Sequence, residues 1–449
     1  MKTIIIPNPH AKLHPLGRWA VLLILSSLLL ATSPRAEWPP ELADFVHHAV
    51  ADNAELAGKR AQLESARQGD KIARAALLPQ ISSRVNKMLT NENGNSEDGN
   101  REDLSIKFSL TQQLFNLPLR TSELAAIAQV KAAEARFQAD LQNLKLSIVT
   151  AWLDWQFATD AFELTQARIK IADEQLKKAE SFVIAGIGTK VDVLQARAQL
   201  ESIRAELLQK KIDEQLAQDR LRYLSGLHGQ QEGRFVLTGG SFPALASQNK
   251  WCRQVYNGSP LVAAARDDIK VAQLFARAGR ETVYPRIVFS ASTEIKGSLS
   301  DHKENVMLSL EQPLFTGGRL TAEREQLAQQ IILADENLRA IIRAESLQCK
   351  QLHSQAAAAQ SQWRALKVAS QASEAALEAV KAGYDGGVRI AADVSDAEKD
   401  LFDLRLQLRR ERYNYLQNLA SLAAQAGKLD DNFINTLSAL FALEGNTNV

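Results

Sequence analysis

The chain has 449 residues, of which 45% are hydrophobic and 23% charged, a balance that excludes both a disordered chain and a fibrous repeat. Lysine and arginine number 53 against 52 aspartates and glutamates, so the overall charge gives no indication of nucleic-acid binding. With only two cysteines, a framework of several disulfides and a zinc site made of thiolates are also excluded.

The first 36 residues have the three parts of a secretory signal peptide. Basic residues up to Arg18 precede the apolar run Trp19–Leu30, and small residues follow up to Ala36. This run is too short for a retained membrane anchor, which needs about 20 residues, so we expect cleavage after Ser33 or Ala36. No later stretch approaches about 18 consecutive apolar residues, so the sequence predicts an exported chain that would need strands to enter a membrane.

The rest of the chain is duplicated. The segment Leu110–Phe115 matches Leu310–Phe315 at an offset of 200 residues, and Ala185-Gly186 matches Ala382-Gly383 at an offset of 197. Each half is expected to contain a helix, two strands and two long helices. The predicted divisions are a signal peptide at 1–36, a first repeat at 37–225, an equatorial linker at 226–259, a second repeat at 260–426 and a carboxyl-terminal tail at 427–449.

Long helices are predicted from apolar residues that recur every seven positions. In the first half these are Leu141, Ile148, Trp155, Phe162, Ile169, Leu176 and Val183. In the second half they are Val394, Leu401, Leu408, Tyr415 and Leu422. One helix from Leu119 to Ala185 would be about 100 Å long, far beyond the size of a compact domain. Periodicity alone does not exclude the alternative that these helices form a soluble coiled-coil rod.

Between the helices, four segments alternate apolar and polar residues, as strands with one apolar face do. They are centred on Ile81–Leu89, Leu104–Thr111, Ile287–Lys296 and Val306–Leu310. Such strands fit a transmembrane barrel with a wet interior. Because four strands cannot close a barrel and open edges are not tolerated in lipid, we expect the barrel to be shared between chains.

Three motifs resemble the TolC-type outer-membrane efflux family. They are residues 312–319 (QPLFTGGR), the turn at 384–397 (YDGGVRIAADVSDA) and its first-half counterpart at 186–194 (GIGTKVDVL). The resemblance implies a mainly α fold with transmembrane β, in which a homotrimer forms a 12-stranded barrel in outer-membrane lipid, continued by a long α-helical tunnel across the periplasm. It also implies a periplasmic adaptor and an inner-membrane transporter of the RND or ABC type as partners, and no cofactor.

The same resemblance implies a gate at the periplasmic tip. Asp192 in the first turn, with Tyr384 and Arg389 in the second, are expected to form a latch of charge-assisted hydrogen bonds. Asp393 and Asp396 would form an acidic ring at the constriction of the trimer, attracting cations. The alternative is that Asp192 and Asp393 only cap helix starts, with Arg389 solvated.

An enzyme is not expected, because the sequence has no G-x-S-x-G motif, no phosphate-binding loop and no metal-binding pattern among its histidines. His47-His48 reads as a solvated pair rather than a metal site. The alternative function is a periplasmic coiled-coil adaptor or structural protein of an export complex. The cargo stays open between drugs, metals and proteins sent by type I secretion.

The two cysteines have two interpretations. Cys252 lies in the linker and Cys349 midway along a second-half helix that the linker would wrap. In the oxidising periplasm they would form a disulfide if their Cα atoms lie within about 7 Å. Otherwise they would remain two buried, unpaired thiols.

Overall fold

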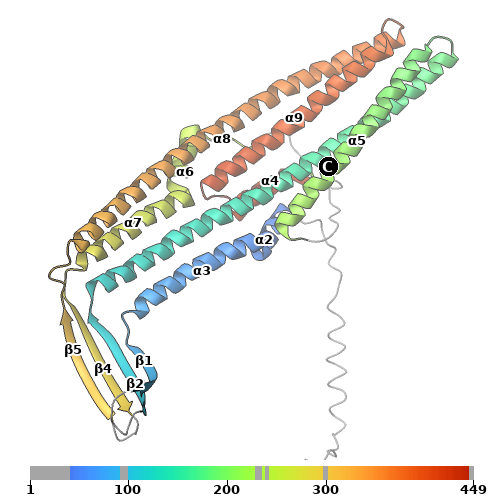
Figure 1. Cartoon of the computed structure of the whole chain (residues 1–449). Helices are drawn as coiled ribbons and strands as arrows, with labels where there is room; N and C mark the ends of the chain where they lie inside the picture. Colours follow the sequence, from blue (N-terminus) through green and yellow to red (C-terminus); the bar gives the residue numbers. More distant parts are fainter. Residues whose placement is uncertain (1–40, 92–99, 228–234, 238–241, 297–301, 444–449) are drawn as a thin grey trace, which may run out of the picture.

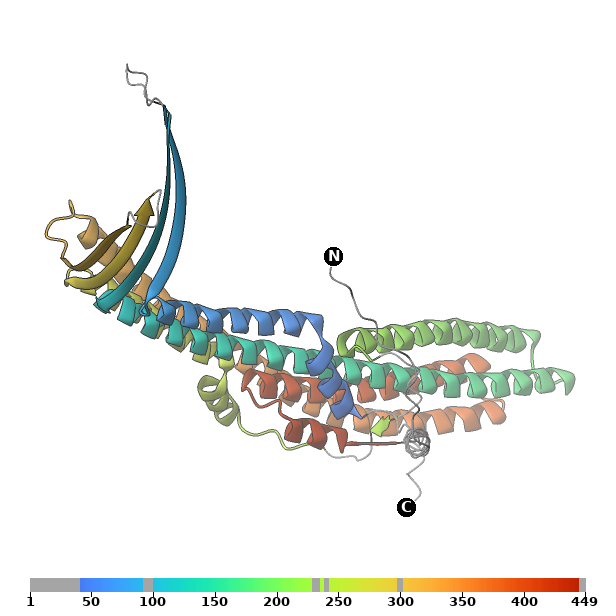
Figure 2. The same ribbon diagram turned by 90° about the horizontal axis from the view of Figure 1, so that it is seen from below.

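The computed structural model describes residues 41–91, 100–227, 235–237, 242–296 and 302–443. The predicted signal peptide lies outside these residues. The molecule is elongated, with long helices along its length, four strands at one end and two helix turns at the other (Figure 1). Figure 2 shows that the strands turn away from the long axis of the helices.

From α3 and α7 onward, the two halves repeat one order of elements, as the internal match predicts. The first half consists of α2 (Leu42–Asp52), α3 (Ala54–Ala75), β1 (Gln80–Asn91), β2 (Asn100–Phe115), α4 (Leu117–Ile184) and α5 (Lys190–Ser225). The second consists of α7 (Pro260–Glu281), β4 (Arg286–Lys296), β5 (His302–Glu311), α8 (Arg319–Asp385) and α9 (Ala391–Gln425). The predicted single helix from Leu119 to Ala185 is confirmed, since α4 has 68 residues.

Four segments outside the two halves lie midway along the molecule, where they pack against the long helices or against each other. They are β3 (Phe235–Leu237), α6 (Gln248–Gly258), α10 (Asp431–Ser438) and β6 (Phe441–Leu443). Strand β3 pairs with β6 in an antiparallel fashion, so the linker and the tail form one small sheet. Helix α6 lies in a stretch that the sequence analysis did not assign to any element.

The four long strands form one antiparallel sheet in the order β1-β2-β4-β5. Across the strands, residues in register share a face. One row is apolar: Ile81, Leu110, Ala291 and Val306. The next row is polar: Ser82, Ser109, Ser292 and Asn305. The predicted alternation is therefore confirmed, and the sheet has an apolar face, a polar face and two outer strands, β1 and β5, each with one unpaired edge in the single chain.

The two passages from strand to long helix use different residues. Asn116 caps α4 by accepting the Leu119 amide at 3.2 Å, and Pro118 occupies the first turn, where its missing N–H is not needed. The second passage bends at Gly317 and Gly318, whose φ angles of 60° and 86° favour glycine.

The apolar core lies midway along the helices, where elements of both halves meet the linker and the tail. Its largest fully buried side chains include Trp152, Tyr413, Tyr415, Phe45, Leu42, Ile148 and Ile434. Small residues on α4 let neighbouring helices approach closely: Ala151, Ala158, Ala172 and Ala179 are all buried. The heptad pattern is thus part of the packing of both halves.

A buried polar contact joins α4 of the first half to α9 of the second. The Tyr413 hydroxyl donates to Asp160 Oδ2 at 3.0 Å, and Arg409 Nη1 lies 3.3 Å from Asp160 Oδ1. Burial, followed by the Asp160 carboxylate, raises the pKa of Tyr413, so its hydroxyl remains a donor. We call these three residues the Asp160 junction.

Cys252 of α6 and Cys349 of α8 form a disulfide, with their Cα atoms 5.7 Å apart. The disulfide hypothesis is confirmed, and the alternative of two unpaired thiols is wrong. The bond fastens the linker to the long helix of the second half. It encloses a sequence separation of 97 residues.

No helix among the described residues has the length and apolar character that crossing a membrane requires.

Candidate functional site

The helix turns at the end opposite the sheet repeat one backbone geometry (Figure 1). In the first hairpin, made of α4 and α5, the Ile187 amide donates to the Phe182 carbonyl at 3.0 Å. In the second hairpin, made of α8 and α9, the Val388 amide donates to the Gly383 carbonyl at 2.9 Å. Each turn has one glycine with a positive φ, Gly186 and Gly387. This end, which we call the tip, carries all five residues expected to form the gate.

Asp192, expected in the latch, lies in the first turn of α5 and forms a reciprocal capping box with Thr189. The amide and hydroxyl of Thr189 donate to Asp192 Oδ2 at 3.0 and 2.6 Å. The Asp192 amide donates back to Thr189 Oγ1 at 3.2 Å. Within one chain this carboxylate therefore caps its own helix, as the capping alternative expects.

Arg389, also expected in the latch, pairs with its own hairpin. Its Nη1 lies 3.5 Å from Asp393 Oδ2, one helical turn further on. No side-chain hydrogen bond caps the start of α9, although Asp393 lies in its first turn. The Arg389 side chain is 58% exposed and keeps this ion pair. Asp396 is also exposed. In a single chain the structure thus brings Arg389 to Asp393 and not to Asp192.

Tyr384, the third latch residue, lies between the two hairpins. Its ring centroid is 5.7 Å from that of Phe182 on α4. Burial, and then the nearby carboxylates of Asp192 and Asp385, raise the pKa of Tyr384. Two of the three predicted latch residues, Tyr384 and Asp192, are therefore close within one chain, and the tyrosine hydroxyl stays protonated.

The sequence analysis missed Lys178 on α4, whose ammonium forms an ion pair with Asp385 at the end of α8. The ammonium also lies 5.5 Å from the ring centroid of Tyr384 and 5.6 Å from that of Phe182. The only local signal is its position just before the first turn. Its partner is 207 residues away in sequence, so no local pattern indicates the pair.

Behind Lys178, a cavity of about 210 Å³ opens between α4, α8 and α9. Its lining mixes apolar and charged side chains: Ile171, Glu174, Gln175, Lys178, Ala179, Lys381, Tyr384, Asp385, Ala391, Val394 and Glu398. The cavity lies at the boundary between the first hairpin and the second.

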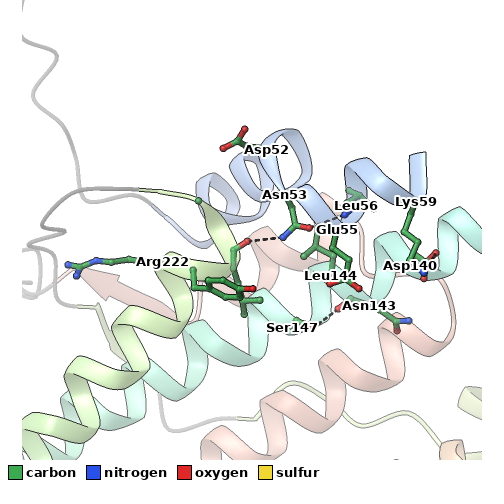
Figure 3. Close-up of a pocket in the computed structure, with 14 residues that line it drawn as sticks. Asp52, Asn53, Glu55, Leu56, Lys59, Asp140, Asn143, Leu144, Ser147 and Arg222 are labelled. Carbon is green, nitrogen blue, oxygen red and sulfur yellow. Dashed lines mark hydrogen bonds and ion pairs between the residues drawn. The ribbon is translucent and has the colours of Figure 1, made fainter. Parts of the chain in front are cut away.

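A larger cavity of about 510 Å³ lies where α2 meets α3, beside α4 and the end of α5 (Figure 3). Asn53 donates from Nδ2 to the Leu224 carbonyl at 3.5 Å and accepts the Leu56 amide at 3.0 Å. Lys59 lies 3.8 Å from Asp140. Because these polar groups pair with one another, we interpret the cavity as part of the helix packing.

In the part of the chain that the structure describes, no three His, Cys, Asp or Glu side chains are grouped to hold a metal ion. The adjacent histidines point to different partners. His47 Nε2 lies 3.6 Å from Asp431 Oδ2, whereas His48 Nδ1 is 2.8 Å from the Ser225 carbonyl oxygen. Their contacts tie α2 to α10 and to the end of α5.

Comparison with known proteins identifies the class. The sequence profile of the outer membrane efflux protein family matches residues 45–227 and 251–428, most of the chain. The chain therefore belongs to the outer membrane efflux protein family. It is an outer-membrane transport protein that extends into the periplasm, and not an enzyme. Family membership favours the predicted channel over the periplasmic adaptor.

Individual relatives match over nearly their full length. The alkaline protease secretion protein AprF of Pseudomonas aeruginosa is 24% identical over 89% of this chain and 87% of its own. The outer membrane protein TolC of Vibrio cholerae is 25% identical over 93% and 98%. The solved CmeC outer membrane channel of Campylobacter jejuni superimposes with a TM-score of 0.75 at 14% identity, covering 98% of this chain and 97% of that one. The fold is shared across all these lengths.

Proposed function

We propose that the protein is a homotrimeric channel-tunnel, the outer component of a tripartite efflux pump or a type I secretion system. Each chain would contribute four strands to a twelve-stranded barrel in the outer membrane. The helices of three chains would enclose a tunnel through the periplasm. Substances delivered at the tip would leave through the tunnel and the barrel without a chemical step.

The observation that carries this proposal is the sheet with two open edges. Strands β1 and β5 each have one unpaired edge, and the apolar row on the same sheet is exposed, with Ile81 at 75% and Val306 at 74%. An unpaired edge beside lipid leaves N–H and C=O groups without partners, at a cost of several kcal/mol each. Pairing β5 of one chain with β1 of the next satisfies both edges and closes a barrel.

The proposed partners follow from the same arrangement. The tip lies far from the sheet, where an inner-membrane transporter of the RND or ABC type and a periplasmic adaptor would reach it. AprF is an alkaline protease secretion protein, which supports proteins as one cargo class. The choice of cargo would be made by the inner-membrane transporter that the channel serves.

Assembly is tested by cross-linking the protein in its native membrane and then measuring the mass of the purified complex in detergent. We expect a trimer whose migration in gels changes on heating, as it does for a closed barrel. Monomers or dimers alone would contradict the proposal. Planar-bilayer recording of the same material should give a pore.

We also propose that the tip is the gate. Asp192, Tyr384 and Arg389 would form the latch, with Arg389 leaving Asp393 to reach the first turn of a neighbouring chain. Asp393 and Asp396 of three chains would form the acidic ring. Interactions at a wet surface are worth about 1 kcal/mol each, so a docking partner could open the gate.

Replacing Asp192 and Arg389 together with alanine should raise single-channel conductance strongly. Because Asp192 also caps α5, the matched control is T189A, which removes the cap hydroxyl and keeps the carboxylate. The D393N/D396N variant should reduce cation preference and block by multivalent cations. An intact D192A/R389A trimer with unchanged conductance would remove the latch assignment.

A further inference from the structure

Ion pairs at the tip differ in which helices they connect. Arg197 pairs with Glu180 at 3.7 Å, which joins α5 to α4 within the first hairpin. Lys381 pairs with Glu398 at 3.4 Å, which joins α8 to α9 within the second hairpin. Among the described residues at the tip, the pair that crosses from one hairpin to the other is Lys178–Asp385.

Lys178 makes more than one contact across this boundary. Its ammonium pairs with Asp385 and lies 5.5 Å from the Tyr384 ring centroid, so it holds the last two residues of α8 at once. On its own helix it lies against Phe182, whose ring is 5.7 Å from that of Tyr384. The charge, the two rings and the carboxylate therefore form one cluster that spans both hairpins.

Two of the predicted latch residues, Asp192 and Arg389, do not perform this task within one chain. The Asp192 carboxylate is held by Thr189 at the start of its own helix, and Arg389 is paired with Asp393 of its own hairpin. In the single chain, each is thus paired within its own hairpin. Lys178, by contrast, already bridges the hairpins.

We propose that Lys178 is the intrachain fastening of the closed tip, holding the second hairpin against the first through Asp385 and Tyr384. The inference rests on the proposed channel function and adds a residue to its gate. The Lys178 and Asp385 side chains are 42% and 55% exposed, so solvent weakens the pair and it can be broken. The buried Asp160 junction lies about 27 Å further along α4 and keeps the two halves joined when the tip pair breaks.

The chain offers a matched control in the adjacent residue. Lys177 has the same charge and nearly the same position, but it pairs with Asp173 of its own helix at 2.7 Å and is 71% exposed. Removing Lys177 changes the local charge equally and leaves the contact between hairpins intact. Any difference in channel opening between the Lys178 and Lys177 variants is therefore due to the lost contact between hairpins and not to the changed local charge.

The experiment measures single-channel conductance and open probability of purified trimers in planar bilayers. K178A and D385A should each raise the open-to-closed ratio about fivefold per chain, the shift that loss of a surface ion pair produces. K177A should behave as the unmodified protein does. The charge-reversed pair K178D/D385K should return the open-to-closed ratio to the unmodified value. It restores the attraction between the two side chains, with the positive charge now on α8 and the negative charge on α4.

Trimer mass in detergent is measured for every variant, so that a folding defect is recognised. An intact K178A trimer with unchanged opening overturns the proposal, and so does an equal effect of K177A or a failure of the reversed pair to restore closure. In each case the unmodified trimer still conducts, and the channel function stands. If the unmodified protein forms no trimer or no pore, the proposed function itself fails.

Discussion

At the scale of single residues, Glu345 is a carboxyl group buried where α7 and α8 meet. It is 8% exposed, and the Ser259 hydroxyl donates to its Oε2 at 3.1 Å. Burial raises the pKa of Glu345 above its ordinary value, against the opposing effect of its hydrogen bonds. The folded protein therefore holds this proton more tightly than the unfolded chain does. Stability from this group is present at low pH and declines as pH rises above about 4.5.

We predict that E345Q raises the melting temperature of the purified trimer more at pH 8 than at pH 4.5. Glutamine removes the cost of burying a charged carboxylate, and this cost is larger at pH 8, because the raised pKa of Glu345 leaves more of the native side chain neutral at pH 4.5. The measurement is thermal unfolding followed by circular dichroism at both pH values. The control E325Q, on the exposed surface of α8, should show no such difference. Equal shifts at both pH values would contradict the prediction.

The residues at the tip show what sequence can and cannot predict. The box between Thr189 and Asp192 is local, with a hydroxyl residue three positions before an acidic one, and the capping alternative anticipated it. The ion pair between Lys178 and Asp385 forms because α4 and α8, which are far apart in the sequence, lie close together at the tip. Lys177 and Lys178 look alike in sequence, and only the rotation of α4 decides which of them faces the second hairpin.

At the scale of elements, the long helices and the strands were predictable because their periodicity is sustained. Seven-residue spacing over α4 and two-residue alternation in the sheet each repeat often enough to identify the element. Helix α6 was not predicted, because its 11 residues are mostly polar and Val255 is its one buried residue. Tertiary contacts, and the disulfide above all, hold such a short helix in place.

We predict that C252S/C349S lowers the thermal stability of the protein and leaves gate conductance unchanged. A bond that closes a loop of this length restricts the unfolded chain and stabilises the fold by up to about 4.7 kcal/mol. The measurement is thermal or chemical unfolding of the double variant beside the unmodified, oxidised protein. Since the bond lies in the linker and α8, away from the tip, the single-channel record should not change. An unaltered unfolding midpoint would show that packing alone holds α6.

At the scale of the whole molecule, the two ends of the described chain meet in one core. Phe45 of α2 and Ile434 of α10 are both fully buried in the cluster that contains Trp152 of α4. Strand β6 follows directly and pairs with β3 of the linker. The tail is therefore a structural part of the fold, although its sequence offers only a short amphipathic pattern.

We predict that I434A destabilises the protein by about 2–5 kcal/mol, because it opens a cavity in this core. The neighbouring variant N435A is the control, since Asn435 is exposed on the same helix and should leave stability nearly unchanged. Chemical unfolding of both purified variants gives the comparison. If the two variants unfolded at the same denaturant concentration, α10 would not belong to the cooperative core.

The unbroken course of α4 has a mechanical consequence. From the Asp160 junction to Ile184 the helix forms a lever of about 36 Å, so a rotation of about 10° moves its end by about 6 Å. Such a swing needs no helical turn to unwind and no backbone hydrogen bond to break. The aperture of the proposed gate would thus widen by the width of a side chain while the amide protons of α4 stay protected from exchange with solvent.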